Sequence, residues 1–150
     1  MQKAPPFTLL NENNEAVSLS DFLGKRVLIF FYPKADTPGC TTQACGFRDA
    51  YPQIEAHGAV VLGISPDSPK DLAKWKAKQG FPFMLLSDPD HTVAEAYGVW
   101  DKKSFWGNTF MGVIRSHFIV DEQGNLAVEE RKISPKDSVK RGIKELLSSE

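Results

Sequence analysis

Cys40 and Cys45 are the two cysteines of this chain, and their type and spacing are the first features that could do chemistry. They lie in the stretch FFYPKADTPGCTTQACGFRD, which runs from Phe30 to Asp49. Two cysteines are too few for a disulfide-rich scaffold. A close pair in a reducing compartment is more often catalytic, redox-active or metal-binding.

The residues around Cys40 predict that it lies in the first turn of a helix. Thr37 is a suitable N-cap residue, and Pro38 suits the first helical position. Apolar residues follow Cys40 at steps of four and three along one helical face: Ala44, Phe47, Tyr51 and Ile54. Unpaired backbone N–H groups and the helix dipole favour an anion at this end, and the thiolate is the nucleophilic form of cysteine. The sequence therefore predicts a reactive sulfur at the N-terminus of a helix.

The spacing places Cys45 on another side of the same helix. A step of five residues rotates it about 140° from Cys40 and separates the two Cα atoms by roughly 8–9 Å. A disulfide tolerates a Cα separation of at most about 7 Å, so the two sulfurs cannot be joined while the helix is intact. Gly46 weakens the helix and Pro52 is expected to interrupt it, which makes unwinding easier. The pair therefore suits a protein that alternates between two structures.

Other uses of the two cysteines stay open from the residues alone: a static structural disulfide, an inert buried pair or a zinc site. A zinc site needs two more ligands, and His57, His91 and His117 show no finger-like spacing, so we expect no metal. Arg48 and Arg115 are the cations that could stabilise a thiolate. The sequence alone does not place either of them beside the sulfur.

Strands and helices alternate along the chain and would position this segment. Apolar runs predict buried strands over 26–32 and 59–65, and a capped helix is expected over 68–80. The other expected elements are two short strands and a short helix ending at Gly24, a strand at 83–88, a helix at 90–98, a hairpin at 116–131 and an amphipathic helix over 134–149. The pattern predicts an α/β fold with three layers and a central mixed sheet.

The segment from Val99 to Arg115 resists assignment to a helix or a strand. It carries two tryptophans and two phenylalanines among polar residues, and we interpret it as a long loop, which is usually functional in a compact domain. Phe105, Trp106 and Phe110 are candidates for an apolar rim that receives alkyl peroxides or a reductant. Simple packing of the loop against the core is the alternative.

Length and composition indicate one globular domain over residues 1–150. The formal net charge of −1 gives no reason to expect nucleic acid or an anionic membrane as a partner. No apolar run approaches the roughly 20 residues of a membrane span, and the start, MQKAPPFTLL, lacks the pattern of a signal peptide. These features favour a cytoplasmic protein.

Pro33, Thr37 and Cys40 form the pattern P-x-x-x-T-x-x-C, which closely resembles the active-site segment of peroxiredoxins. Within them the chain resembles the peroxiredoxin Q group, also called bacterioferritin comigratory proteins. The stretches VVLGISPDSP, LLSDPDHTVAEAYGVW and MGVIRSHFIVDEQG fit as well, so the resemblance covers nearly the whole chain. Small departures include Glu15, where a turn glycine is common, and His117, where a small Thr or Ser is common.

The resemblance implies a thioredoxin-like three-layer sandwich with an N-terminal β-hairpin extension and flanking helices. It implies that Cys40 is the peroxidatic cysteine and that Cys45 is the resolving cysteine of the same chain. Arg115 matches the arginine that approaches the reactive sulfur, so it is preferred to Arg48, for which a surface or structural ion pair is the alternative. The hydroxyl of Thr37 would be a further hydrogen-bond donor at the sulfur.

By the same resemblance the chain would be a thiol peroxidase that reduces hydrogen peroxide and organic hydroperoxides. Pro33 would shield the sulfur from water, or simply end the preceding strand. We expect a monomer, regenerated by thioredoxin or a glutaredoxin-like dithiol protein, with no metal, flavin or nucleotide cofactor. The competing functions are a protein thiol–disulfide oxidoreductase, which usually carries a C-x-x-C dithiol absent here, and a redox sensor.

Overall fold

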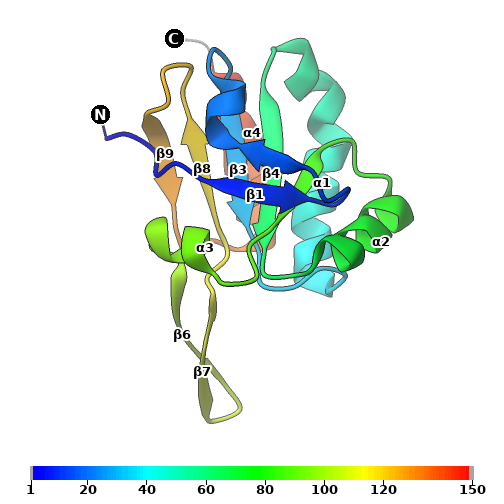
Figure 1. The fold of residues 1–150 in the computed structure, drawn as a ribbon, viewed down its shortest axis with the longest axis vertical. Coiled ribbons are helices and arrows are strands. Elements are labelled where there is room, and N and C mark those ends of the chain that lie inside the picture. The colour runs from blue at the N-terminus through cyan, green and yellow to red at the C-terminus, as the bar shows by residue number, and fades with distance from the viewer. Residues whose placement is uncertain (1, 149–150) are drawn as a thin grey trace.

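The computed structural model describes residues 2–148 of the chain (Figure 1). Its elements in chain order are β1 (Thr8–Asn11), β2 (Ala16–Ser18), the 3-10 turn η1 (Leu19–Phe22), β3 (Val27–Phe31), α1 (Pro38–Ala56), β4 (Val60–Ser65), α2 (Pro69–Gln79), β5 (Met84–Ser87), α3 (Thr92–Ala96), β6 (Trp100–Phe105), β7 (Asn108–Val113), β8 (Ser116–Val120), β9 (Leu126–Glu130) and α4 (Pro135–Leu147). Within residues 2–148, no helix combines the length and the apolar character needed to cross a bilayer.

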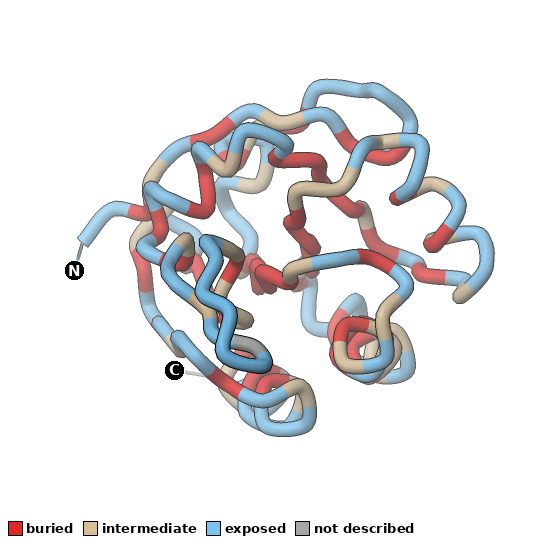
Figure 2. Tube along the Cα trace, turned by 90° about the horizontal axis from the view of Figure 1, so that it is seen from below, coloured by how far each residue is buried: buried red, intermediate tan, exposed pale blue. Residues whose placement is uncertain are grey.

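Seven strands form one mixed sheet in the order β2-β1-β5-β4-β3-β8-β9. The β3–β4 and β4–β5 pairs are parallel, and the remaining pairs of this sheet are antiparallel, including the N-terminal hairpin of β1 and β2. One core cluster joins one face of the sheet to α1, α2 and α4, and a second joins the other face to α3, η1 and the N-terminal segment. The buried segments accordingly gather in the interior in Figure 2. The predicted α/β class, three layers and mixed sheet are confirmed.

The central strand β3 carries the cysteine segment to its place. All five of its side chains are buried, as the apolar run predicts for a strand covered on both faces. At its carboxyl end Phe31 pairs with Ser116, the first residue of the antiparallel strand β8. The start of α1 and the residue that precedes β8, Arg115, therefore meet at the same end of the sheet.

The helix limits follow the capping signals read from the sequence. Ser68 accepts a hydrogen bond from the amide of Asp71 at the start of α2, and Gly80 ends that helix with a left-handed backbone (φ 67°). Ser134 caps α4 in the same way. The short helix expected before Gly24 is a single 3-10 turn. The prediction that Pro52 interrupts α1 is wrong, because the helix continues through it to Ala56.

The segment from Val99 to Arg115 is the main departure from the predicted fold. It forms a two-stranded antiparallel hairpin of β6 and β7, not a loop, and extends from the body of the molecule (Figure 1). Trp106 and Gly107 make the turn, both with positive φ (52° and 77°), as a two-residue hairpin turn of the primed type requires. Trp106 is 86% exposed and Phe110 49%, so packing against the core does not account for them. The side chain of Phe105 lies outside the described part of the structure.

Candidate active site

Cys40 lies in the first turn of α1, two residues after Pro38, and is fully buried. Thr37 occupies the N-cap position with an extended backbone, as predicted. Its side chain makes no capping bond, because the hydroxyl donates instead to the carbonyl oxygen of Lys34 at 2.8 Å. Pro33 is half-buried in the turn between β3 and α1. Both cysteines are free thiols in this structure.

Arg115 is the cation beside the sulfur. Its Nη1 and Nη2 atoms each lie 3.5 Å from Cys40 Sγ, and Nη1 also donates to Gln43 Oε1 at 2.8 Å. Gly39 leaves room for this guanidinium, since a Cβ atom there would lie 3.1 Å from Nη2. A guanidinium at this distance stabilises negative charge on the sulfur, in addition to the helix N-terminus.

Arg48 makes contacts with Asp49 and the end of α2, as its ion pair and hydrogen bond show. Its guanidinium pairs with Asp49 at 2.9 Å and donates to the backbone carbonyl of Gln79 at 2.8 Å, at the end of α2. The structural ion pair considered as the alternative for Arg48 is therefore what the structure contains. The preference for Arg115 as the residue that approaches the sulfur agrees with the observed contacts.

Cys45 faces α2 from the middle of α1. Its sulfur lies 3.4 Å from Gln79 Oε1, and the side chain is half-buried. Burial raises the pKa of the Cys45 thiol, an effect that nearby Arg48 partly offsets. The two cysteines thus differ in environment: one sulfur faces a guanidinium, and the other is held as a neutral thiol against an amide oxygen.

Known proteins resemble this chain in sequence and in structure. The AhpC/TSA family matches residues 1–129. The putative peroxiredoxin Bcp of Haemophilus influenzae is 56% identical over 135 residues, 90% of this chain and 87% of that protein. Peroxiredoxin Bcp of Bacillus subtilis is 45% identical over 145 residues, 97% and 92% of the two chains. A structure of the Xanthomonas campestris bacterioferritin comigratory protein, studied for alkyl peroxide reduction, has a TM-score of 0.88 at 32% identity over 93% of this chain and 89% of that one.

The chain belongs to the AhpC/TSA family and is a peroxiredoxin of the Bcp group. Its fold is the thioredoxin-like fold of its structural neighbours, and it is a thiol peroxidase of the atypical two-cysteine type. The resemblance recognised from the P-x-x-x-T-x-x-C pattern is confirmed. The fold and enzyme class that this resemblance implied are confirmed with it.

The peroxiredoxin also has a positively charged pocket that Arg115 lines and that the sequence does not predict. It has a volume of about 580 Å³ and includes Arg115 with Lys102, Lys103 and Lys132. Lys103 donates to the carbonyl of Val113 at 3.0 Å, and its pKa is lowered by burial and by the charge of Arg115. No spacing in the sequence indicates this pocket, because Lys102 and Lys103 lie on the β6–β7 hairpin and Lys132 follows β9.

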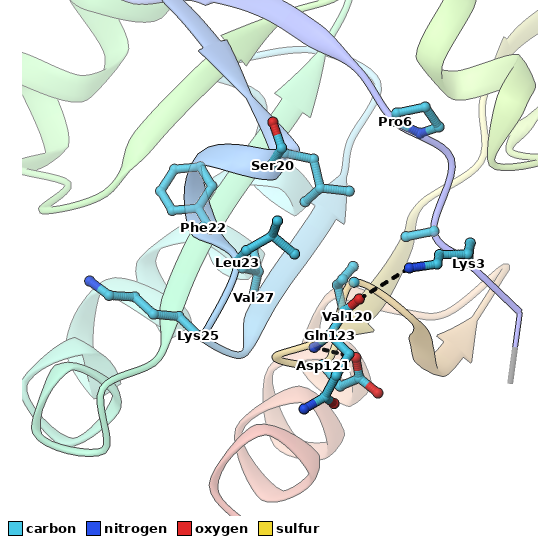
Figure 3. Close-up of a pocket in the computed structure, with 13 residues that line it drawn as sticks. Lys3, Pro6, Ser20, Phe22, Leu23, Lys25, Val27, Val120, Asp121 and Gln123 are labelled. Atoms are coloured by element: carbon cyan, nitrogen blue, oxygen red, sulfur yellow. Dashed lines mark hydrogen bonds between the residues drawn. The ribbon is translucent and has the colours of Figure 1, made fainter.

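A second, apolar cavity of about 230 Å³ lies far from the cysteines (Figure 3). It opens near Val27 and Val120, where β3 begins and β8 ends, whereas the cysteine segment follows the other end of β3. Phe22 and Leu23 form one wall, and Lys3 lies on the opposite side, bonded to the carbonyl of Gln123. Neither cysteine lines this cavity.

Within residues 2–148, His117, Glu130 and Glu145 form a group whose potential metal-ligating atoms lie within 4.8 Å of one another. His117 Nε2 and Glu145 Oε1 are hydrogen-bonded at 2.9 Å. Glu130 hydrogen-bonds Glu145, which raises the pKa of the Glu130 carboxyl, and Arg141 lies 3.5 Å from it. The three side chains are therefore linked to one another and to Arg141 by hydrogen bonds and an ion pair.

Proposed function

We propose that Cys40 is the peroxidatic cysteine. Its thiolate attacks one oxygen of a hydroperoxide, the O–O bond breaks, and the other oxygen leaves as an alkoxide or hydroxide that takes up a proton. Cys40 becomes a sulfenic acid. The observation that carries this proposal is the pair of Arg115 nitrogens 3.5 Å from the sulfur, at the amino end of α1. That charge stabilises the thiolate and the oxygen that leaves.

Three further groups are proposed to assist this step. The backbone N–H of Cys40, in the first helical turn, is available to the substrate oxygen. The hydroxyl of Thr37 would turn from the carbonyl of Lys34 toward the peroxide. Pro33, half-buried beside the segment, would limit the access of water to the sulfur.

Cys45 is proposed as the resolving cysteine. Its thiol attacks the sulfenic acid of Cys40, a disulfide forms within the chain, and water leaves. The two residues lie five apart on one continuous helix, so this step requires the first turns of α1 to unwind. A dithiol protein, thioredoxin or a glutaredoxin-like reductant, then reduces the disulfide and returns both thiols.

The protein is proposed to act as a monomer, because formation of the disulfide within one chain needs no partner subunit. It is also proposed to be a single domain and to act in the cytoplasm. Hydrogen peroxide and alkyl hydroperoxides are the proposed substrates. The exposed aromatic side chains of Trp106 and Phe110 on the β6–β7 hairpin would form the apolar rim for alkyl groups or for the reductant.

Two cysteine variants test the proposal. Cys40→Ser is expected to abolish peroxide consumption, because the nucleophile is lost. Cys45→Ser is expected to consume one equivalent of peroxide and then accumulate sulfinic acid at Cys40, because nothing traps the sulfenic acid. Mass spectrometry after one equivalent of H2O2 should find the internal Cys40–Cys45 crosslink in the wild type alone.

The outcomes separate this function from its competitors. Sustained turnover with thioredoxin and its reductase is expected of a peroxidase and not of a redox sensor. A thiol–disulfide oxidoreductase would react faster with a model disulfide than with peroxide. Normal cycling of Cys45→Ser with thioredoxin would exclude Cys45 as the resolving cysteine.

A further inference from the structure

His117 lies in a buried chain of hydrogen bonds that starts at Glu145 on α4. Glu145 Oε1 lies 2.9 Å from His117 Nε2, and His117 Nδ1 lies 2.8 Å from the hydroxyl of Ser138. The amide nitrogen of Gln43, on α1, donates to the same hydroxyl at 2.9 Å. The side chains of His117, Ser138 and Gln43 have no solvent exposure, so water does not compete for the hydrogen bonds that join these three residues, whereas the Glu145 side chain is 25% exposed.

This series of hydrogen bonds ends at Cys40 Sγ. Gln43 Oε1 accepts from Arg115 Nη1 at 2.8 Å, and the same nitrogen lies 3.5 Å from Cys40 Sγ. The guanidinium is a rigid planar fork, so a bond that fixes Nη1 also fixes the direction in which Nη2 points. Gln43 therefore sets the orientation of Arg115 toward the sulfur.

Donor and acceptor chemistry is compatible with one consistent direction along this series of hydrogen bonds. Arg115 can only donate, so the oxygen of Gln43 faces it and the amide nitrogen faces Ser138. The Ser138 oxygen accepts from that amide, so its hydrogen is free to go to His117 Nδ1. The proton of the neutral imidazole then lies on Nε2 and is donated to Glu145, which accepts as a carboxylate. The contacts at the two ends of the series fit the same tautomer of the imidazole, with its proton on Nε2.

We propose that His117 and Ser138 are positioning residues for Arg115, an inference that rests on the proposed role of Arg115 at Cys40. The imidazole accepts the Ser138 hydrogen, which leaves the serine oxygen turned toward Gln43. Gln43 in turn holds the guanidinium on the line of the breaking O–O bond. These hydrogen bonds join β8, α4 and α1, so three elements together hold Arg115 near the sulfur.

The test uses a Cys45→Ser background, in which Cys40 is the single thiol. The second-order rate constant of Cys40 is measured with H2O2 by stopped flow and with iodoacetamide by mass spectrometry. Iodoacetamide needs the thiolate but does not need Arg115 at a leaving oxygen. The ratio of the two constants therefore cancels the thiolate fraction and reports the position of the guanidinium.

Ser138→Ala removes the acceptor of Gln43 and is expected to lower this ratio about five- to tenfold, the effect of one hydrogen bond. Ile143→Val, on the same helix as Ser138 and packed against the core cluster that contains Cys40, removes a methylene without a polar contact and is expected to keep the parent ratio. A Ser138→Ala ratio within about twofold of the parent would overturn the proposal, even if the protein melted at a lower temperature. A parent that reacts slowly with H2O2 would instead contradict the proposed function.

Two substitutions at His117 test the far half of the chain. Asn has a side-chain oxygen that can accept the Ser138 hydrogen, whereas Leu has none. His117→Asn is expected to keep the ratio near that of the parent, and His117→Leu is expected to lower it. Equal ratios in the two variants would show that the imidazole does not position Arg115.

Discussion

The side chain of His117, on β8, is buried against α4, and this burial lowers the pKa of its imidazole to about 4. In the unfolded chain the same histidine has an ordinary pKa of about 6.5. Between these two values the unfolded state binds a proton that the folded state does not, so acid favours unfolding. The charged groups around the ring are Glu145, which is hydrogen-bonded to it, and the pair formed by Glu130 and Arg141.

We therefore expect the free energy of unfolding to fall by about 2 kcal/mol between pH 7 and pH 5 through this residue. Urea unfolding at the two pH values measures the change. His117→Asn serves as the control, because it removes the titrating group and should lose this part of the pH dependence. The same decline in the variant and the wild type would assign it to other residues.

The residues of the site differ in how far the sequence could identify them. Cys40 was placed at a helix start by its own neighbours, because Thr37 and Pro38 are local signals. Arg115 contacts the sulfur from 75 positions away, and only the resemblance to peroxiredoxins pointed to it. Gln43 and Ser138 are 95 positions apart, and no local pattern predicts that they meet. The one sequence signal for their contact was an unusual residue, His117, where the family commonly has a small Thr or Ser.

At the scale of elements, Gly46 in α1 has a packing role that the sequence does not indicate. The sequence indicates a weak point in a helix. The structure adds that α1 and α4 pack closely here, since a Cβ atom at Gly46 would lie 2.4 and 2.7 Å from the two methyl carbons of Val139. The glycine is needed for the approach of the two helices.

Gly46→Ala is therefore expected to lower the free energy of unfolding by about 1 to 3 kcal/mol through overpacking, although alanine is the better helix former. The double variant Gly46→Ala with Val139→Ala removes the clashing methyl groups and should recover most of the loss. Chemical denaturation of the three proteins measures both effects. If the single variant were more stable than the wild type, helix propensity would outweigh the contact.

The strands that the sequence predicted and the hairpin that it missed differ in burial. β3 and β4 are covered on both faces, and their apolar runs are long enough to recognise. β6 and β7 are largely exposed, and their apolar residues do not alternate regularly along the strands, so no periodic pattern reveals them. The remaining signal was Gly107 after Trp106, a weak indication of a two-residue turn. Exposed strands that are held together by their own hydrogen bonds are therefore hard to recognise from the hydropathy pattern of a sequence.

At the scale of the whole molecule, the two core clusters separate the helix that is proposed to open from the opposite face of the sheet. The cluster around α3 and the N-terminal segment packs on one face, and α1 contributes to the other face only. Opening the first turns of α1 removes Cys40 and Ala44 from one cluster. The other cluster, which includes Ile29, Phe31 and Phe118, keeps its contacts. Disulfide formation should therefore be a local rearrangement and not a global unfolding.

Amide hydrogen exchange can test this separation. In the reduced protein we expect slow exchange in α1 from Thr41 onward, because that amide is the first to donate to a helical carbonyl, that of Thr37, at 2.8 Å. After one equivalent of H2O2 the amides between residues 41 and 47 should exchange at least about tenfold faster, since forming the crosslink breaks their helical bonds. The amides of β3 and β8 should be unchanged, because their ladder lies outside the rearranged segment. Cys45→Ser treated in the same way cannot form the crosslink and should keep the reduced pattern. Faster exchange throughout the sheet of the oxidised protein would show that the two clusters open together, and that the helix is not an independent unit.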